Sequence, residues 1–227
     1  MRATSNAATG RDSLEVCELF VSIAGESSLA GVPAFFIRLA GCNLDCRWCD
    51  TPRARKPGRI VPVADLLDKV RSRPYRHVVV TGGEPLRQAA CPLLMHKLLE
   101  AGRLVMVETN GSLPIEDLPA GVRVIMDFKP PASGQMHRMR EENLDHMHAG
   151  DDLKLVIAER ADFDWALDWL ARHELRPGVN ILLSPAFQQL EPALLAEWML
   201  QSGIQARLQI QMHRAIWPDG RDGWPID

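Results

Sequence analysis

Residues 34–51 read AFFIRLAGCNLDCRWCDT, in which an apolar run leads directly into a loop with three cysteines. The apolar run predicts a β-strand, because aromatic and branched aliphatic side chains favour extended backbone. Cys42, Cys46 and Cys49 follow within eight positions, and Trp48 stands directly before the third cysteine. Thiols this close together predict a metal or iron-sulfur site in the loop after the strand.

In the rest of the chain, short strand-like runs alternate with helical patterns. The alternation predicts an α/β fold with a mostly parallel sheet. The helices are fewer than a complete barrel requires, which favours an open, partial (β/α) barrel with a reduced helical layer. The expected strands lie at residues 16–23, 34–40, 77–82, 104–109, 122–128, 152–157, 179–184 and 206–213, and the expected helices at 63–72, 91–102, 161–173 and 192–203.

The pattern indicates one folded unit. Two irregular stretches remain, residues 130–150 and 217–227, but no repeat or low-complexity linker divides the chain. With 227 residues, the chain is long enough to bury a sizeable core. We expect a single domain over residues 13–227, preceded by a flexible tail of small and polar residues at 1–12.

Composition narrows the class of protein. A net charge of -3 gives no broad attraction to phosphate backbones, so we expect a small-molecule substrate and no nucleic-acid partner. We find no run of about 18 apolar residues and no secretory leader, which favours a cytoplasmic protein without a membrane partner. Of the five cysteines, three are clustered and two are isolated, a distribution that suits a metal in a reducing compartment better than disulfides.

Polar motifs follow several of the expected strands. Thr81-Gly82-Gly83-Glu84-Pro85, Glu108-Thr109-Asn110-Gly111 and Asp127-Phe128-Lys129 each begin where an apolar run ends. Because the carboxyl ends of parallel strands meet at one edge of a sheet, these motifs and the cysteine loop should converge on one crevice.

The cysteine spacing leaves two kinds of site open. A structural zinc site closes with four ligands, so it would need Cys17, Cys91 or a histidine as the fourth. Cys17 lies inside an expected strand and Cys91 opens an expected helix, and both are expected to be small buried residues. Three thiolates on a four-iron cluster would leave one iron open to a small molecule.

The spacing Cys-x3-Cys-x2-Cys, the aromatic Trp48 and the later Gly-Gly-Glu-Pro resemble the signature of radical S-adenosylmethionine (SAM) enzymes. The resemblance implies a [4Fe-4S] cluster held by Cys42, Cys46 and Cys49, whose open iron binds the amino and carboxylate groups of SAM. One-electron reduction then yields methionine and a 5'-deoxyadenosyl radical. Such an enzyme implies an electron donor such as flavodoxin or ferredoxin.

A longer series of blocks is similar to the 7-carboxy-7-deazaguanine synthase family. The blocks are LFVSIAGESSLAGVPAFFIRLAGCNLDCRWCDT, VVVTGGEP, VETNG, DFKPPASG, DDLKLVI and LQIQMHR. The resemblance implies conversion of 6-carboxy-5,6,7,8-tetrahydropterin to 7-carboxy-7-deazaguanine with loss of ammonia, in queuosine biosynthesis for tRNA modification. Many members carry Gln-Gly-Glu-Gly where this chain has Ala24-Gly25-Glu26-Ser27, which puts any contact of that glutamine in doubt here.

The family resemblance assigns cofactor and substrate roles to particular residues. Arg38 is the informative one, because a cation in an apolar strand needs a partner: a substrate carboxylate, or else an ion pair with Glu15 or Glu18. Glu26 has the charge for guanidine-like nitrogens, and His213 suits a core histidine as well as a substrate contact. The resemblance places Trp48, Asp50, Gly83, Glu84, Ser133 and Gly134 at SAM, with Glu108 and Asn110 as weaker candidates, and Ile23, Ala24, Gly25, Arg38, Thr81 and Asp227 at the pterin.

Thr51 receives a metal role from the same resemblance. In this family the threonine of Cys-Asp-Thr binds a Mg2+ ion that also holds the substrate carboxylate, whereas local sequence alone favours a turn or N-cap hydroxyl before Pro52. Arg38, Thr51 and Glu26 are therefore the candidate catalytic residues. Two other functions stay open: an activase that installs a glycyl radical in a partner protein, and a zinc or iron-sulfur module without catalysis. A homodimer is expected from base rates.

Overall fold

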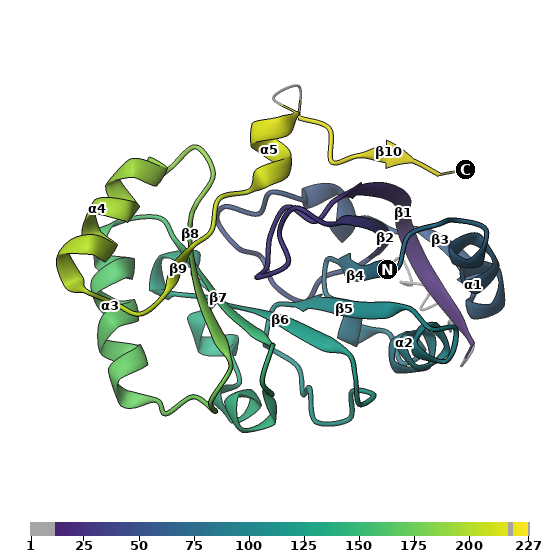
Figure 1. Ribbon diagram of the computed structural model, residues 1–227, viewed down its shortest axis with the longest axis horizontal. Helices are drawn as coiled ribbons and strands as arrows, with labels where there is room; N and C mark the ends of the chain where they lie inside the picture. Colours follow the sequence, from purple (N-terminus) through teal and green to yellow (C-terminus); the bar gives the residue numbers. More distant parts are fainter. Residues whose placement is uncertain (1–11, 218–219, 227) are drawn as a thin grey trace, which may run out of the picture.

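The computed structural model describes residues 12–217 and 220–226. Within these residues ten strands form a single sheet, flanked by helices (Figure 1). The strands are β1 (Ser13–Ile23), β2 (Pro33–Leu39), β3 (Arg59–Pro62), β4 (His77–Gly82), β5 (Leu104–Thr109), β6 (Arg123–Phe128), β7 (Asp152–Ile157), β8 (Asn180–Pro185), β9 (Arg207–Leu208) and β10 (Trp224–Pro225). The α-helices are α1 (Val63–Arg71), α2 (Cys91–Glu100), α3 (Arg160–Arg172), α4 (Pro192–Ser202) and α5 (Met212–Ile216).

The sheet is mostly parallel and does not close. Its order is β10-β1-β2-β4-β5-β6-β7-β8-β9, with β3 also paired to β1. From β2 to β9 every neighbouring pair is parallel, whereas β1 runs antiparallel to β2, β3 and β10. The two ends of this order do not pair with each other, so the prediction of an open, partial barrel is confirmed.

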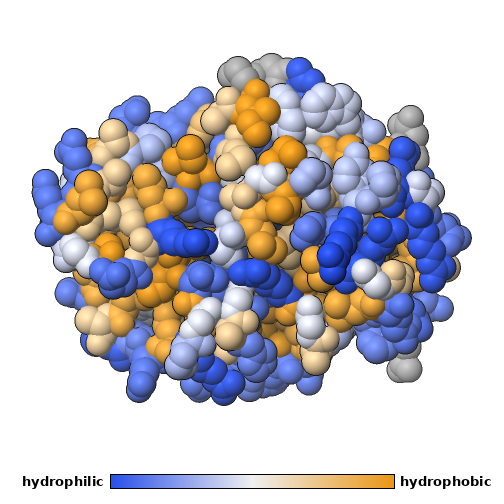
Figure 2. Space-filling model, viewed as in Figure 1, coloured by the Kyte–Doolittle hydropathy of each residue, from blue (hydrophilic) through white to orange (hydrophobic). Residues whose placement is uncertain are grey.

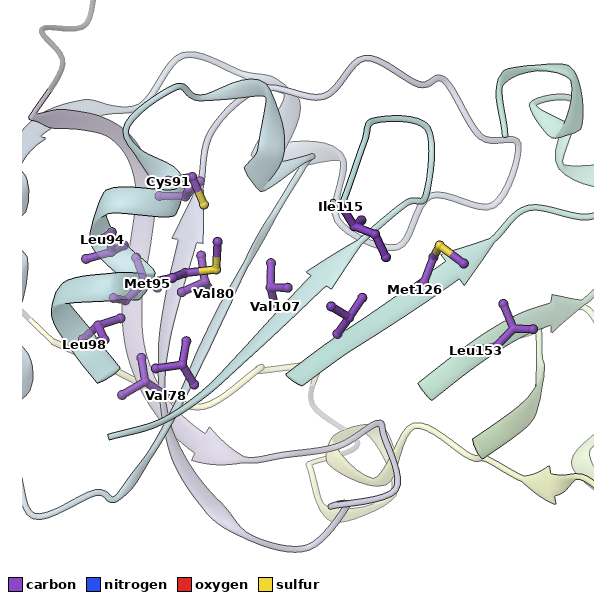
Figure 3. Close-up of a cluster of buried hydrophobic side chains, with 14 of the residues drawn as sticks. Val78, Val80, Cys91, Leu94, Met95, Leu98, Val107, Ile115, Met126 and Leu153 are labelled. Atoms are coloured by element: carbon purple, nitrogen blue, oxygen red, sulfur yellow. The ribbon is translucent and has the colours of Figure 1, made fainter. Parts of the chain in front are cut away.

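Alternation along each strand separates two cores. Residues such as Ile37, Val80 and Val107 point outward and pack against the helices in one large apolar cluster. Figure 3 shows part of it, with Leu94, Met95 and Leu98 of α2 beside Val78 and Val80 of β4. A smaller cluster covers the inner face and consists of Phe20, Ala34, Phe36, Val79, Met106 and Ile125. Burial of each large apolar side chain stabilises the fold by roughly 1.5–3 kcal/mol.

The helical layer is reduced in the middle of the sheet. The β5–β6 connection contains no helix, and the β6–β7 connection contains only the 3-10 turns Pro131–Ser133, Met136–Arg138 and Glu141–His146. In Figure 1, α1 and α2 therefore flank one end of the sheet, and α3 and α4 flank the other. In the same view the surface shows hydrophobic and hydrophilic side chains interspersed (Figure 2). No helix of the described residues is both long and apolar enough to cross a membrane.

The C-terminal part differs from the prediction. The expected strand at 206–213 is wrong in extent: only Arg207–Leu208 is strand, and α5 begins at Met212. After β9 the Met212 amide nitrogen donates to the Gly25 carbonyl oxygen at 3.0 Å, which joins the start of α5 to the loop after β1. Sequence analysis also missed β3, β10 and α5, all of them five residues or shorter.

Candidate active site

The inner face of the sheet carries polar side chains near the carboxyl ends of its strands. Six neighbouring strands contribute one each, and all six line a single cavity of about 200 Å³. On β2, β4, β5 and β6 an apolar residue of the inner cluster stands two positions before the polar residue, on the same face of the sheet, since side chains alternate with a period of two. The six polar residues are Arg38, Thr81, Glu108, Asp127, Lys154 and Ser184.

The cysteine loop forms another wall of this cavity. Cys42, Cys46 and Cys49 all line it, and all five cysteines of the chain are free thiols. The Cys42 sulfur accepts contacts from the Leu44 amide at 3.5 Å and from Asn110 Nδ2 at 3.9 Å. Hydrogen bonds of this kind stabilise a thiolate bound to iron.

The residues present fit an iron-sulfur cluster. Burial raises the pKa of the Cys46 thiol, and Lys129 opposes the rise, so a bound metal would be needed to keep the thiolate. In the described chain no group of three or more Cys, His, Asp or Glu side chains is placed to hold one metal ion. Thiolates on a four-iron cluster each bind a different iron, so they need not meet at one point.

Three predicted cofactor or metal residues lie beside the cysteines. Trp48, Asp50 and Thr51 line the cavity. The buried Trp48 Nε1 has no hydrogen-bond partner among the described residues, and an acceptor on a ligand would satisfy it. Thr51 donates to Asp50 Oδ1 at 2.9 Å.

The Gly82-Gly83-Glu84 turn packs directly on the cysteine loop. A Cβ atom at Gly83 would lie 2.3 Å from the Gly41 carbonyl oxygen, so only glycine allows this approach. The Glu84 amide donates to the same oxygen at 2.9 Å. Gly82 and Gly83 line the cavity, as predicted for a SAM site.

Glu84 is not among the residues that line the cavity, so its predicted contact with the SAM ammonium stays a prediction. Its side chain is fully buried and accepts hydrogen bonds from Thr109 Oγ1 at 2.9 Å and from the amides of Asn110 and Leu86 at 2.7 and 3.0 Å. Burial raises the pKa of Glu84, and these donors oppose the rise. The carboxyl group therefore ties two loops of the site together.

Ser133 and Gly134 also lie outside the cavity wall. The Ser133 hydroxyl is buried and bonds to the Pro130 carbonyl oxygen, so it is not presented to a ribose. The loop nevertheless supports the cysteine loop, since the Arg47 amide donates to the Ser133 carbonyl oxygen at 3.3 Å. Gly134 adopts a φ of 73° at the end of this turn.

Glu26 is held by two partners inside the cavity. Its carboxylate accepts from Lys154 Nζ at 2.7 Å and from Gln211 Nε2 at 2.8 Å. Gln211 Nε2 also donates to Asp50 Oδ2 at 2.8 Å, so one amide joins the first strand's loop to the cysteine loop. The buried Gln211 Oε1 lacks a donor within the described chain and offers an acceptor at this wall.

Lys129, Asp127 and the buried Lys154 form a chain of charges across the ends of β6 and β7. Lys129 Nζ lies 2.9 Å from Asp127 Oδ1, and Lys154 Nζ lies 3.3 Å from Oδ2. Burial lowers the pKa of a lysine, but Glu26 and Asp127 outweigh it and hold the pKa of Lys154 above its ordinary value. Both lysines thus remain cationic.

Arg38 lines the cavity but is paired within the protein. Its Nε donates to Glu18 at 2.6 Å, and its Nη2 donates to Asp222 at 3.0 Å. Arg53 Nη2 contacts the same two carboxylates, Asp222 and Glu18, and lies 2.8 Å from Glu18 Oε1. The predicted alternative of an ion pair with Glu18 is therefore present, and the guanidinium still borders the cavity.

Ile23 and Gly25 line the cavity, whereas Ala24 does not. The Ala24 amide donates to Val32 and its carbonyl oxygen accepts from Gly31, so its backbone groups are already used. A Cβ at Gly25 would lie 2.1 Å from His213 Nδ1, which shows how closely that histidine packs on the wall.

The remaining predicted substrate residues are Thr81 and Asp227. Thr81 lines the cavity and donates to Glu108 Oε2 at 2.7 Å. Burial, followed by the charge of Glu26, raises the pKa of Glu108. Asp227 lies outside the described residues, so its predicted role stays a prediction.

Sequence analysis missed several polar residues of the site, among them Lys154, Ser184, Gln211 and Asp222. Lys154 carries the same signal as Arg38, a cation within the apolar run DLKLVI. Gln211 lies in the block LQIQMHR, where nothing in the sequence distinguishes it from Gln209, and Asp222 gave no signal, because polar residues are ordinary in a C-terminal segment of irregular pattern.

The fold and the cysteine loop define the class of protein. Residues 36–127 match the profile of the Radical SAM superfamily. The structure of QueE from Escherichia coli resembles this fold with a TM-score of 0.71 at 22% identity, and covers 93% of this chain and 100% of its own. SuiB from Streptococcus suis bound to its precursor peptide has a TM-score of 0.55 at 12% identity, and covers 79% of this chain and 49% of its own. The chain is thus a radical SAM enzyme, a class that uses a [4Fe-4S] cluster and SAM.

Curated relatives narrow the class further. The 7-carboxy-7-deazaguanine synthase of Chlorobaculum tepidum is 40% identical over 212 residues, which cover 92% of this chain and 96% of that protein. The synthase of the same name from Koribacter versatilis is 36% identical over 219 residues, covering 90% and 97%. That of Aquifex aeolicus is 43% identical over 211 residues, covering 88% and 91%. This chain belongs to the 7-carboxy-7-deazaguanine synthase family.

Proposed function

We propose that the enzyme converts 6-carboxy-5,6,7,8-tetrahydropterin to 7-carboxy-7-deazaguanine, with loss of ammonia, in queuosine and 7-deazapurine biosynthesis. One observation carries the proposal: the three cysteines line the same cavity as five carboxylates and five permanent cations. The carboxylate of the pterin needs cations in its pocket, and its guanidine-like edge needs carboxylates. This cavity contains both.

In this proposal, Cys42, Cys46 and Cys49 hold the cluster, and the cleft beside Trp48, Asp50 and Gly83 receives SAM. When bound, the reduced cluster supplies the electron that cleaves SAM to methionine and a 5'-deoxyadenosyl radical, which removes hydrogen from C6 of the pterin. The protein supplies position and electrostatics. Gly83 allows the close approach of the two loops, and Trp48 Nε1 offers a donor that finds no acceptor among the residues the structure describes.

The substrate residues divide by charge. Arg38, backed by Arg53, presents a cation to the carboxylate of the pterin. On the other side Glu26 and Gln211 Oε1 accept hydrogen bonds from the guanidine-like edge, and Lys154 fixes the Glu26 carboxylate at 2.7 Å. Glu108 lines the same cavity, has a pKa raised by burial and accepts the Thr81 hydroxyl on Oε2, which makes its carboxyl group the candidate proton donor for the departing nitrogen.

A magnesium ion is the second metal of the proposal. Thr51 borders the cavity and lies next to Asp50, so its hydroxyl and a substrate carboxylate offer the hard oxygen ligands that Mg2+ prefers. The ion would fix the carboxylate and offset negative charge that develops during rearrangement.

The remaining partners are also proposed. The enzyme takes electrons from a flavodoxin or ferredoxin, acts in the cytoplasm as a homodimer, and binds no nucleic acid itself. A single folded domain over residues 13–227 carries the whole site.

Anaerobic reconstitution with iron and sulfide tests this function. We expect a visible cluster spectrum, and 7-carboxy-7-deazaguanine and ammonia formed together from the carboxypterin, SAM and a reductant. Formation of 5'-deoxyadenosine only with a protein partner would identify a glycyl-radical activase instead, and no SAM cleavage under any condition would identify a non-catalytic module.

A further inference from the structure

The loop between β1 and β2, residues 24–32, crosses the concave face of the open sheet. It carries Gly25 and Glu26 into the cavity. Figure 1 shows this dark purple loop in the middle of the view, above β6. Strands at the two ends of the sheet do not pair, and the loop contacts β7, which lies inside the sheet.

The loop is attached to β7 by two side-chain contacts in matching register. Glu26 contacts Lys154 at 2.7 Å, and two residues farther along the loop Ser28 contacts Asp152. Lys154 and Asp152 are two positions apart on one strand, so they share the inner face. The loop therefore runs along β7 like an antiparallel partner, but it is joined by side chains.

Asp152 binds this loop through both oxygens of its carboxylate. Its side chain is fully buried, Oδ2 accepts from the Ser28 amide nitrogen at 2.9 Å, and Oδ1 accepts from the Ser28 hydroxyl at 2.5 Å. Asn180 donates to Oδ1 at 3.0 Å, and Arg123 supplies the countercharge at 3.7 Å. A buried carboxylate needs such partners, and here two of the four contacts come from the loop.

The backbone between the two anchors is under strain. Ser27 has a φ of 93°, in the left-handed region that a residue with a Cβ adopts at a cost. Such strain persists only where the surroundings fix the conformation. Contacts on both sides of Ser27, at Glu26 and Ser28, supply that constraint.

We infer that Asp152 is a positioning residue for the substrate: through Ser28 it fixes the loop that presents Gly25 and Glu26 to the pterin. The inference rests on the proposed function for its substrate, but the anchoring itself does not. Asp152 lies at the amino end of β7, whereas Lys154 borders the cavity, so Asp152 acts on the site through the loop.

Asp152→Asn tests the anchor against a matched control, Asp151→Asn. Asp151 is the neighbouring buried carboxylate, and it binds the amides of Val124 and His148 at 2.8 and 2.7 Å instead of the loop. Ser28→Ala breaks the same contact from the loop and removes only one hydroxyl group. It is therefore the variant to use if Asp152→Asn folds poorly.

The first measurement is amide hydrogen exchange of the protein without SAM or substrate. We expect faster exchange in residues 23–32 for Asp152→Asn and Ser28→Ala, and unchanged exchange there for Asp151→Asn. Equal exchange of the loop in all three variants and the wild type would overturn the inference, whatever the enzyme's substrate.

The second measurement separates substrate from cofactor. We expect Asp152→Asn to raise KM for the carboxypterin by about tenfold, the scale for a lost charged hydrogen bond, while the SAM dissociation constant stays within about twofold. A parallel loss of SAM affinity, or the same KM change in Asp151→Asn, would reduce Asp152 to a general stability residue. Absence of carboxypterin turnover in the wild type would reject the proposed function and leave the exchange result standing.

Discussion

Arg38 Nη2 lies 3.0 Å from Asp222 Oδ2, so the C-terminal segment pairs with the guanidinium that borders the cavity. The segment is also fixed by β10 on β1 and by the Ile226 amide, which donates to the Leu19 carbonyl oxygen at 2.9 Å. The residues that close this side of the site therefore come from opposite ends of the chain.

Arg38→Met should weaken binding of the carboxypterin by about tenfold or more, the scale for loss of a charge-assisted pair. SAM binding should change little, because Arg38 lies away from the cysteine loop's own contacts. Titration of each ligand by calorimetry measures this. Arg59→Met, on the exposed strand β3, is the control for a lost positive charge. Equal weakening of both ligands would assign Arg38 to the ion-pair cluster alone.

Cys46→Ala should abolish cluster iron and SAM cleavage while the chain still folds, since the loop is supported by bonds that involve no cysteine sulfur. Iron analysis and circular dichroism after anaerobic reconstitution measure both outcomes. Cys91→Ala is the matched control, because this buried thiol lies in α2, outside the cavity. Four irons per chain and normal turnover in Cys46→Ala would reject the ligand set.

Thr51→Ala should lower turnover of the carboxypterin more than it lowers SAM affinity, and the wild type should depend on Mg2+. Turnover is measured after chelation that leaves the cluster spectrum intact, and again after Mg2+ is restored. Full activity of the chelated wild type would remove magnesium from the proposal.

Stability should depend on pH through Glu84, whose pKa burial raises above the ordinary value of 4.5. A raised folded-state pKa favours the native state below 4.5, and this contribution is lost as pH rises toward the folded-state pKa, by at most about 1.4 kcal/mol per pH unit. Glu84→Gln lacks this titration, so the unfolding free energy of the wild type relative to the variant should fall as pH rises above 4.5. If the unfolding free energies of the wild type and Glu84→Gln, measured with denaturant, changed equally with pH, the raised pKa of Glu84 would be contradicted.

The sequence predicted the strands correctly where a local pattern of side chains determines them. Strands 77–82, 104–109 and 152–157 match β4, β5 and β7 in both bounds, because each is a buried apolar run with polar residues beside it. The spacing of the three cysteines was enough to predict a metal or iron-sulfur site in their loop. The orientation of Glu84 could not be predicted, since a carboxylate after two glycines has the same sequence whether it faces a ligand or, as here, the loop at Asn110.

The pairing of distant segments was the part that sequence could not supply. Asp222 and Arg38 are 184 positions apart, and no local pattern records their contact. β10 and β9 have two residues each, too short for any periodicity to appear. Their positions follow from tertiary packing.

The support of the cysteine loop by neighbouring backbone has a consequence for the order of maturation. Gly41 is tied to Ala54 at 2.6 Å and to Glu84 at 2.9 Å, and Arg47 is tied to Ser133, without use of any sulfur. In zinc fingers, by contrast, the metal supplies the folding free energy, so folding and metal uptake are one event. Here the backbone bonds that hold the cysteine loop need no metal, so we expect the loop to reach its folded conformation before the cluster is inserted.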